Sequence, residues 1–406
     1  MADRSLMRTS DFDYHLPPKL IAQTPIEPRD SSRLMVMHRE TGSLEHRQFP
    51  DLLEYLRSGD VMVFNQSRVI PARLYGRRAD TGSKVEFLLL RRFADGTWQA
   101  MARPGRRLRA GVVVEIEEQK SPKSLQPPFT KGGLTCFAEE DGNREKLPPP
   151  DLNRDKWGTE GGFSPGFTPG FSVEVIAAHP DGLKTVRLSS EEDIERFGHT
   201  PLPPYIKERL DDSERYQTVY SRQPGSVAAP TAGLHFTDGL LRKVRDLGVE
   251  TAFVTLHVGL DTFKPVDEEN PTEHKIHTEH YQIDSQAAEA LNRARAEGRR
   301  IIAVGTTTVR VLEQAAHDLE LRGQSALSVA EAEASLFILP GHPFRLVDAM
   351  ITNFHLPRSS LLMLVSAFVG SGTSAISGRG RVMSAYEEAI EQQYRFYSFG
   401  DAMLIA

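Results

Sequence analysis

The sequence has little cysteine and no long apolar run. Cys136 is the only cysteine in 406 residues, which excludes a disulfide framework or a cysteine-rich metal site within the chain. A single cysteine is typical of proteins from a reducing compartment. Met1 to Leu6 lack an apolar signal segment, and the longest apolar run, 361–370, is too short for a membrane helix of ~20 residues. We therefore expect a cytoplasmic protein that is not embedded in a membrane.

Common nucleotide and zinc motifs are also missing. Neither Gly-x-x-x-x-Gly-Lys nor Gly-x-Gly-x-x-Gly occurs, which excludes the P-loop and the dinucleotide fingerprint. His-Glu-x-x-His is absent too, and His274, His277 and His280 follow Pro271 without a helical pattern that would align them. We expect no bound metal and interpret 273–280 as a polar segment that faces a substrate.

Basic residues are outnumbered by acidic residues over the whole chain but are concentrated in one stretch. The chain has 49 Lys and Arg against 55 Asp and Glu, a net charge of -6 and a pI of about 6.1, which excludes a generally cationic nucleic-acid coat protein. Residues 68–109, however, contain eleven basic and three acidic side chains. This surplus suits contact with a phosphate backbone, and an ordinary solvated face is the alternative.

The length and the order of patterns predict two domains. Short apolar runs separated by turn signals, typical of a small barrel or sandwich, are found at 85–90, 97–101, 112–116, 171–178 and 183–188. After Pro201, strand and helix patterns alternate, which indicates an α/β domain. Helices are expected at 51–56, 237–247, 284–297, 306–318, 359–369 and 384–396, and strands at 61–64, 249–258, 300–304 and 346–352.

We therefore predict the α/β fold class, with a mixed α/β main domain interrupted by a small β-barrel domain. The main domain is discontinuous and comprises 1–73 and 200–406, and the inserted barrel domain comprises 74–199. Residues 117–170 contain few periodic apolar residues, so we expect a flexible insertion within the barrel domain there. Because of this insertion, the sequence does not define the exact boundaries of the barrel domain.

A loop at 225–236 is a candidate ligand site. It combines small, turn-forming residues with a histidine just before an expected helix, and it contains Pro230, Thr231, Gly233 and His235. Such a backbone can approach a ligand closely and offer its N–H groups. An ordinary tight connection between two elements is the alternative.

A strand, a glycine and a helix start follow one another at 304–310. Thr306 and Thr307 place hydroxyls beside the free N–H groups of the expected helix, and Arg310 lies one turn further on. This combination suits a carboxylate or a phosphate. Capping of the helix by threonine is the alternative.

Two more histidines, His257 and His355, stand at expected strand ends. Open α/β sheets bind ligands at such ends, and neutral histidine can exchange a proton near neutral pH. A single histidine in this position is more often structural. Together with His235, however, three of them favour a functional site.

Nine stretches with distinctive sequences are distributed over nearly the whole chain outside 117–170. They are 12–17, 60–73, 201–206, 215–220, 230–236, 254–260, 304–310, 352–357 and 394–403. In these stretches and in their order the chain resembles the S-adenosylmethionine:tRNA ribosyltransferase-isomerases of queuosine biosynthesis.

The resemblance implies a monomeric, cytoplasmic protein with an α/β domain and a β-barrel domain. It implies a tRNA substrate that carries 7-aminomethyl-7-deazaguanine at the wobble position. The ribosyl part of S-adenosylmethionine would be transferred to that aminomethyl group and isomerised, giving epoxyqueuosine in tRNA, adenine and methionine. S-adenosylmethionine would be a consumed substrate, with no metal or organic cofactor.

The residues suit this chemistry, because each step is a proton transfer combined with positioning. As a hypothesis, His235, His257 and His355 transfer protons, with base and acid unassigned. Thr306, Thr307 and Arg310 would hold the methionine carboxylate or a ribose hydroxyl, and Asn65, Arg68 and Arg73 would lie near the base or its phosphate where the two domains meet. The expected substrate-binding set also includes Pro230, Thr231, Gly233 and Asn353.

Two other functions stay open from the sequence. A noncatalytic tRNA-binding protein would bind RNA through its basic β domain without consuming S-adenosylmethionine. An S-adenosylmethionine-dependent RNA methyltransferase would produce S-adenosylhomocysteine, although the chain lacks the glycine-rich loop after an N-terminal strand that is usual in that class.

Overall fold

Burial on both faces explains the central strands of the main sheet. In β3 (Val61–Asn65), Val61 and Val63 belong to one buried cluster, whereas Met62 and Phe64 belong to another. Successive side chains of a strand point to opposite faces, so an uninterrupted apolar run is needed where both faces are covered. The computed structural model that shows this describes residues 7–118, 170–259, 265–276, 278–370 and 375–406.

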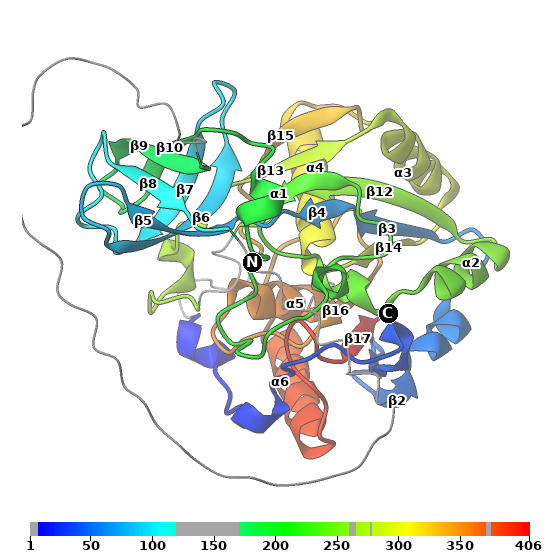
Figure 1. Cartoon of the computed structure of the whole chain (residues 1–406). Coiled ribbons are helices and arrows are strands. Elements are labelled where there is room, and N and C mark those ends of the chain that lie inside the picture. The colour runs from blue at the N-terminus through cyan, green and yellow to red at the C-terminus, as the bar shows by residue number, and fades with distance from the viewer. Residues whose placement is uncertain (1–6, 119–169, 260–264, 277, 371–374) are drawn as a thin grey trace, which may run out of the picture.

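Nine strands form this sheet (Figure 1). Their order is β15 (Ala330–Ala334), β13 (Glu279–Ile283), β12 (Glu250–Leu256), β3, β14 (Ile301–Val304), β16 (Ala349–Asn353), β17 (Ala402–Ile405), β1 (Arg33–Met37) and β2 (Leu44–Gln48). The four adjacent strands β12, β3, β14 and β16 run parallel to one another. Their C-terminal ends therefore lie at one edge of the sheet, where ligands bind in open α/β sheets.

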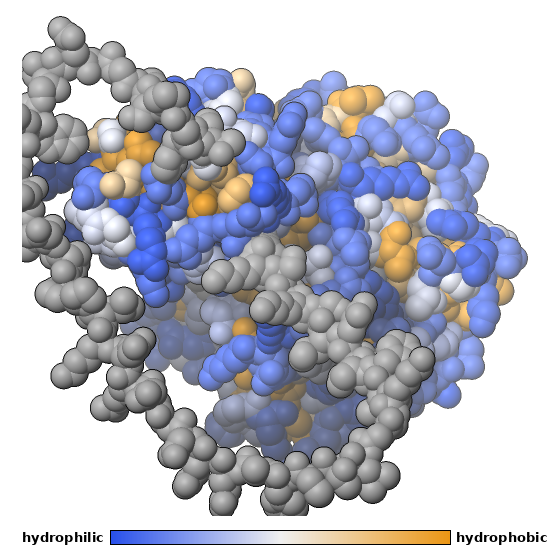
Figure 2. All heavy atoms as spheres, in the orientation of Figure 1, coloured by the Kyte–Doolittle hydropathy of each residue, from blue (hydrophilic) through white to orange (hydrophobic). Residues whose placement is uncertain are grey.

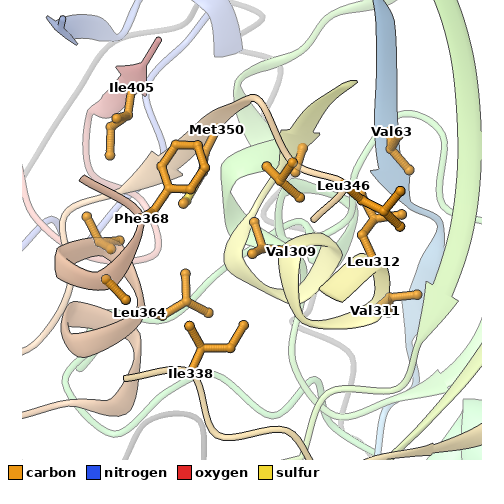
Figure 3. Close-up of a cluster of buried hydrophobic side chains, with 14 of the residues drawn as sticks. Val63, Val309, Val311, Leu312, Ile338, Leu346, Met350, Leu364, Phe368 and Ile405 are labelled. Atoms are coloured by element: carbon orange, nitrogen blue, oxygen red, sulfur yellow. The ribbon is translucent and has the colours of Figure 1, made fainter. Parts of the chain in front are cut away.

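Helices cover both faces of the sheet. One face packs against α3 (Ser285–Glu297), α4 (Thr306–Leu321), α5 (Ser360–Gly370) and α6 (Ala375–Glu391). The other face packs against α2 (Asp238–Asp246) and the 3₁₀ helix η5 (Phe49–Tyr55). Figure 3 shows Phe368 of α5 beside Met350 of β16, and Leu312 of α4 near Val63 of β3. The sheet and its helices thus form a three-layered core.

The predicted helix ends depend on local capping, and two of them are confirmed. Thr237 Oγ1 accepts a hydrogen bond from Leu240 N at 3.1 Å at the start of α2. Asp284 caps α3 in the same way, and α3 ends at Gly298. The predicted helix at 51–56 is the 3₁₀ helix η5. The helix predicted at 384–396 instead spans 375–391.

Six antiparallel strands close into the predicted barrel. Their order is β10 (Lys184–Leu188), β7 (Trp98–Arg103), β6 (Lys84–Arg92), β5 (Arg73–Arg78), β8 (Val113–Ile116) and β9 (Ser172–Ala178). Alternate side chains such as Val85, Phe87 and Leu89 fill its interior. The fold class is therefore confirmed, whereas the exact domain boundaries stay a prediction. The expected insertion lies outside the described residues, apart from 117, 118 and 170.

The barrel and the sheet meet beside a small parallel pair, β4 (Ser67–Val69) and β11 (Gln223–Ser226). Arg91 of β6 also pairs with Glu333 of the edge strand β15 at 2.9 Å. Figure 2 shows hydrophilic residues over most of the visible described surface, with apolar residues in small separate areas. Among the described helices, none combines the length and apolar character that spanning a membrane requires.

Candidate active site

A pocket opens where the parallel strands end. It contains about 590 Å³ of empty space, including its opening to solvent. Residues after β14 and β16 form much of its wall, as the strand-end prediction required. The lining consists of 229–232, 305–307, 352–356 and the side chains of Tyr205, Val258, Ser359, Leu361, Tyr397 and Ser398.

Helix α4 begins at this pocket. Gly305 has φ +91° and ψ 148°, a conformation that is nearly restricted to glycine. Gly305, Thr306 and Thr307 line the pocket, and no described side chain caps the helix at Gly305. Thr308 donates to the carbonyl of Val304 at 2.7 Å. The positive helix end therefore faces the pocket and suits an anionic or polar ligand group.

A hydrogen-bonded chain fixes Asn353 at the pocket wall. Thr231 Oγ1 donates to Asn353 Oδ1 at 2.8 Å, and Asn353 Nδ2 lies 3.2 Å from His235 Nε2. Because an amide nitrogen only donates, His235 accepts at Nε2 and carries its proton at Nδ1, 2.8 Å from Ser32 Oγ. Thr231 and Asn353 line the pocket, whereas His235 supports Asn353 from behind and lines a neighbouring pocket.

His355 is the one of the three predicted histidines that lines the pocket. Its backbone N–H donates to Tyr386 Oη at 3.0 Å, and its carbonyl accepts a hydrogen bond from Tyr14 Oη. Its Nε2 lies 2.8 Å from Thr352 Oγ1. The imidazole is therefore held in one position beside the space that a ligand would fill.

Burial keeps all three histidines neutral at pH 7. It lowers the pKa of His355 to about 3 and that of His235 to about 3, with a further contribution from the charges of Arg395 and Arg29 in the second case. It lowers the pKa of His257 to about 4, to which His280 contributes. A neutral imidazole has a lone pair that accepts a hydrogen bond or a proton, and its protonated form returns the proton readily.

His257 lies at the end of β12 but does not belong to the pocket lining. Its ring stacks on His280, with centroids 6.1 Å apart and an angle of 6° between the planes. Its Nδ1 is buried, and no described residue bonds to it. A Cβ placed on Gly225 would lie 2.9 Å from His257 Cε1, so the backbone of β11 packs directly against the ring. The adjacent Val258 does line the pocket.

Asn65 acts as a connector beneath the pocket. It is fully buried at the end of β3. Its Oδ1 accepts hydrogen bonds from the backbone of Leu256 and Ser67, both at 3.1 Å, and its Nδ2 donates to Leu256 O at 3.1 Å and Thr307 Oγ1 at 3.3 Å. Asn65 therefore ties β3 to β12 and to the first turn of α4, without belonging to the lining itself.

Arg310 and Gly233 have packing contacts away from the lining. Arg310 is buried and pairs with Glu279, whose Oε1 accepts from Gly259 N at 2.9 Å. A Cβ on Gly233 would lie 1.9 Å from Tyr220 Oη, so this position has room for glycine only. The structure therefore brings neither residue to the pocket, and their roles in substrate binding stay a prediction.

Arg68 and Arg73 lie where the chain passes from the main sheet into the barrel. Arg68 pairs with Glu214 and donates to Ser221 Oγ at 3.1 Å. The Nε of Arg73, the first residue of β5, lies 3.6 Å from Glu86. Neither belongs to the pocket lining, so contact with a nucleotide stays a prediction.

Tyr205, Tyr397 and Ser398 line the pocket and were missed as site residues. Tyr205 Oη lies 2.7 Å from Ser398 Oγ, and the rings of Tyr205 and Tyr397 are 4.7 Å apart. They lie outside the helices and strands, where no periodicity marks them. The only available signal was their place in the stretches 201–206 and 394–403.

Ion pairing divides the basic stretch 68–109 into two parts. Six of its basic residues pair with carboxylates: Arg68, Arg73, Arg77, Arg78, Arg91 and Arg92. The segment 103–109 carries exposed Arg103, Arg106, Arg107 and Arg109, while Leu108 anchors it in the barrel core. No ion pair joins these four arginines to a described carboxylate. Segment 103–109 and the exposed Lys84 are therefore the parts of the stretch whose positive charge pairs with no described carboxylate.

The described residues of the polar segment 273–280 form no metal-binding site. No group of three His, Cys, Asp or Glu side chains there could hold a metal ion. His274 Nδ1 lies 2.7 Å from Glu268, and His280 approaches Glu331 at 3.3 Å. His277 lies outside the described residues.

The chain is thus an α/β protein with a pocket at the strand ends and an attached barrel that presents positive charge. The sequence profile of a family described as queuosine biosynthesis protein matches residues 9–405. The chain belongs to this family.

Particular relatives make the resemblance more specific. Proteins from Dehalococcoides mccartyi (strain CBDB1), Clostridioides difficile (strain 630) and Carboxydothermus hydrogenoformans are 44%, 44% and 47% identical over 399, 399 and 400 residues. Each match covers 98% of this chain and 100% of the relative, and each relative is named S-adenosylmethionine:tRNA ribosyltransferase-isomerase. The chain is thus an enzyme of this family.

A solved structure is also similar. It is the crystal structure of an S-adenosylmethionine tRNA ribosyltransferase from Thermotoga maritima, 34% identical, with a TM-score of 0.48 and coverage of 98% of this chain and 100% of that chain.

Proposed function

We propose that this enzyme is an S-adenosylmethionine:tRNA ribosyltransferase-isomerase. It transfers and isomerises the ribosyl moiety of S-adenosylmethionine onto 7-aminomethyl-7-deazaguanine in tRNA, giving epoxyqueuosine in tRNA, adenine and methionine. One observation carries the proposal: the stretches 230–236, 304–310, 352–357 and 394–403 are far apart in sequence, yet all contribute to one pocket. These are stretches in which the chain resembles the family.

The pocket offers complementary places for the donor. The N-terminus of α4, with Thr306 and Thr307, suits the methionine carboxylate or a ribose hydroxyl. Asn353 and Thr231 offer an oriented amide and hydroxyl to the sugar or the adenine. The face of Tyr205 or Tyr397 suits an adenine ring or the sulfonium cation. These assignments fit a polar, cationic nucleoside.

His355 is the proposed proton carrier. The sulfonium acidifies the adjacent ribose carbon, whose proton passes to the lone pair of the neutral imidazole. Burial lowers the pKa of His355, which disfavours this first transfer and favours the second, in which the imidazolium gives the proton to the departing adenine. The aminomethyl group of the RNA then attacks the activated sugar as the neutral amine and loses one proton, and methionine leaves with the electron pair of the carbon–sulfur bond. In this proposal His235 orients Asn353. A role of His257 in proton transfer requires that the backbone around Gly225, which packs against its ring, moves.

The remaining substrate and assembly features belong to the same proposal. No separate cofactor takes part, because the sulfonium substrate already carries the reactive group. Segment 103–109 contacts tRNA phosphates, supported by its exposed arginines. The enzyme acts as a cytoplasmic monomer in this proposal, and the single cysteine supports a reducing compartment. Light scattering of the purified protein would reveal a dimer if the monomer were wrong.

The function is tested by incubating the protein with S-adenosylmethionine and tRNA that bears 7-aminomethyl-7-deazaguanine. Adenine and methionine are the expected products. Release of S-adenosylhomocysteine would indicate a methyltransferase, and RNA binding with no consumption of the donor would indicate a noncatalytic protein.

The role of His355 is tested in the same assay with His355→Gln. Loss of general acid–base catalysis typically costs a factor of about 100 or more in kcat, and we expect a loss of that order with donor binding retained. His179→Gln, at an exposed turn of the barrel, is the control and should keep wild-type rates. A His355→Gln enzyme with near-normal adenine release would remove His355 from the mechanism.

A further inference from the structure

A second pocket adjoins the first beside His235. It contains about 260 Å³ of empty space, including its opening to solvent, and its lining includes Arg29, Arg215, His235 and Ser398. Ser398 lines both pockets, and His235 bonds to Asn353 of the first. A group bound in the second pocket would therefore lie next to the proposed reaction site.

Arg29 brings a guanidinium to this pocket that is held by backbone carbonyls. Its Nη1 donates to Gln217 O and its Nη2 to Glu214 O, both at 2.7 Å. No described carboxylate forms an ion pair with it. Burial lowers the pKa of Arg29, and the charge of Arg215 lowers it further, although the charges of Glu27, Asp212 and Glu214 oppose this shift. Backbone carbonyls thus fix the position of this cation without cancelling its charge.

Arg215 is the second cation of the pocket. It donates to Ile26 O at 2.6 Å and pairs with Glu27 at 2.9 Å. The Glu27 side chain is 74% exposed, whereas that of Arg215 is 17% exposed. Water therefore screens the carboxylate strongly, and the pairing compensates the more buried guanidinium only in part.

Arg395 adds positive charge from the neighbouring wall. Its Nη2 donates to the carbonyl of Thr24, next to the pocket-lining Pro25. Burial lowers the pKa of Arg395 although Asp401 opposes the shift. Holding like charges together in a half-buried place costs free energy, and a bound anion would offset that cost.

We propose that this second pocket binds one phosphodiester group of the RNA substrate, through Arg29 and Arg215. The inference rests on the proposed function, which makes RNA the substrate. Arginine suits phosphate because its planar fork donates two parallel hydrogen bonds. The carboxylate of the donor already has a place at the start of α4, in the first pocket. A phosphate held beside His235 would position the RNA backbone next to the reacting base.

Arg29→Gln and Arg215→Gln test the site by binding of a modified anticodon stem-loop across a range of salt concentrations. Loss of one phosphate contact should weaken RNA binding about tenfold at ~0.1 M salt and reduce the slope of log Kd against log salt by about one. Affinity for S-adenosylmethionine should not change. Arg242→Gln, which alters an exposed arginine of α2, is the matched control and should leave both affinities as in the wild type.

Thermal unfolding shows which variants are folded. Arg29 holds two backbone carbonyls, so its replacement can disturb the fold as well as the site. Arg215→Lys is a milder change at the second cation, and it should retain the salt slope but lose part of the affinity. Unchanged RNA affinity and salt slope in the folded glutamine variants would overturn the site. A selective loss of donor binding would overturn it as well, because it would assign the arginines to the carboxylate. The proposed function itself fails only if the wild-type protein releases no adenine, so the two failures are distinguishable.

Discussion

Asn353 shows how side chains that do not face a ligand can set the geometry of a site. Thr231 and His235 hold its two amide ends, and Ser32 bonds to the other ring nitrogen of His235. The amide therefore presents one orientation to the pocket. A buried polar chain of this kind is stable only while each member keeps its partner.

Thr231→Val should lower kcat/KM for S-adenosylmethionine about fivefold. Valine keeps the shape of threonine but leaves Asn353 Oδ1 without its donor, and one such hydrogen bond contributes about 1 kcal/mol. The double variant Thr231→Val with Asn353→Ala should be no worse than Asn353→Ala alone, because both changes remove the same interaction. Adenine release gives the rates, and Thr81→Val, at an exposed turn, is the control. Additive losses would contradict the coupling.

At the scale of elements, local signals predicted those elements that carry their own caps or burial pattern. Helices α2 and α3 and strand β3 are of this kind. Strand β15 has the sequence Ala-Glu-Ala-Glu-Ala, which is poor in the residues that favour strands, and it is held by pairing with β13. Helix α6 was predicted too late in the chain, because Gly378 and Gly380 weaken the helical pattern of its first half.

The pocket residues also divide into those that local signals predicted and those that they did not. Its strand-end residues, such as Thr306, Asn353 and His355, could be predicted because a parallel sheet brings strand ends together. Tyr205 and Ser398 could not, because their contact joins segments 193 residues apart and no local pattern encodes such a meeting. Arg310 looked like a ligand residue from its place in α4, yet its side chain pairs with Glu279 inside the fold.

Gly305→Ala should both destabilise the protein and weaken donor binding. The conformation of Gly305 costs about 1–3 kcal/mol for other residues. A Cβ there would meet its nearest neighbours at 3.6 and 3.8 Å, so the penalty is conformational rather than a clash. Relief of the strain would shift the first turn of α4 and raise KM for S-adenosylmethionine. Urea unfolding and initial rates measure the two effects.

Gly239→Ala is the matched control for this change. Gly239 lies within α2, where alanine favours the helix over glycine by up to about 1 kcal/mol. It should therefore be neutral or stabilising, with an unchanged KM. Equal behaviour of the two alanine variants would show that the conformation at Gly305 does not position α4.

At the scale of the whole molecule, the site places three neutral imidazoles in the interior of an otherwise acid-rich protein. Arg29 and Arg395 face His235, and His280 faces His257, so neighbouring charges add to the effect of burial. His355 is shifted by burial alone. All three histidine pKa values are shifted downward, so all three couple the stability of the fold to pH in the same direction.

The free energy of unfolding should therefore fall as the pH decreases below about 6.5, the ordinary pKa of histidine. In the unfolded chain these histidines bind protons below that pH, whereas in the folded protein they bind them only near pH 3 to 4. The unfolded state thus holds more protons within this window, and each histidine contributes up to about 1.4 kcal/mol per pH unit. Urea unfolding at several pH values between 7.5 and 5 should show a slope that is shallower by about 1 kcal/mol per pH unit in His355→Gln, while His179→Gln keeps the wild-type slope. If His355→Gln left the slope unchanged, the imidazole of His355 would already be charged, or accessible to protons, in the folded protein, and it could not carry the proton between the ribose carbon and adenine in the way proposed.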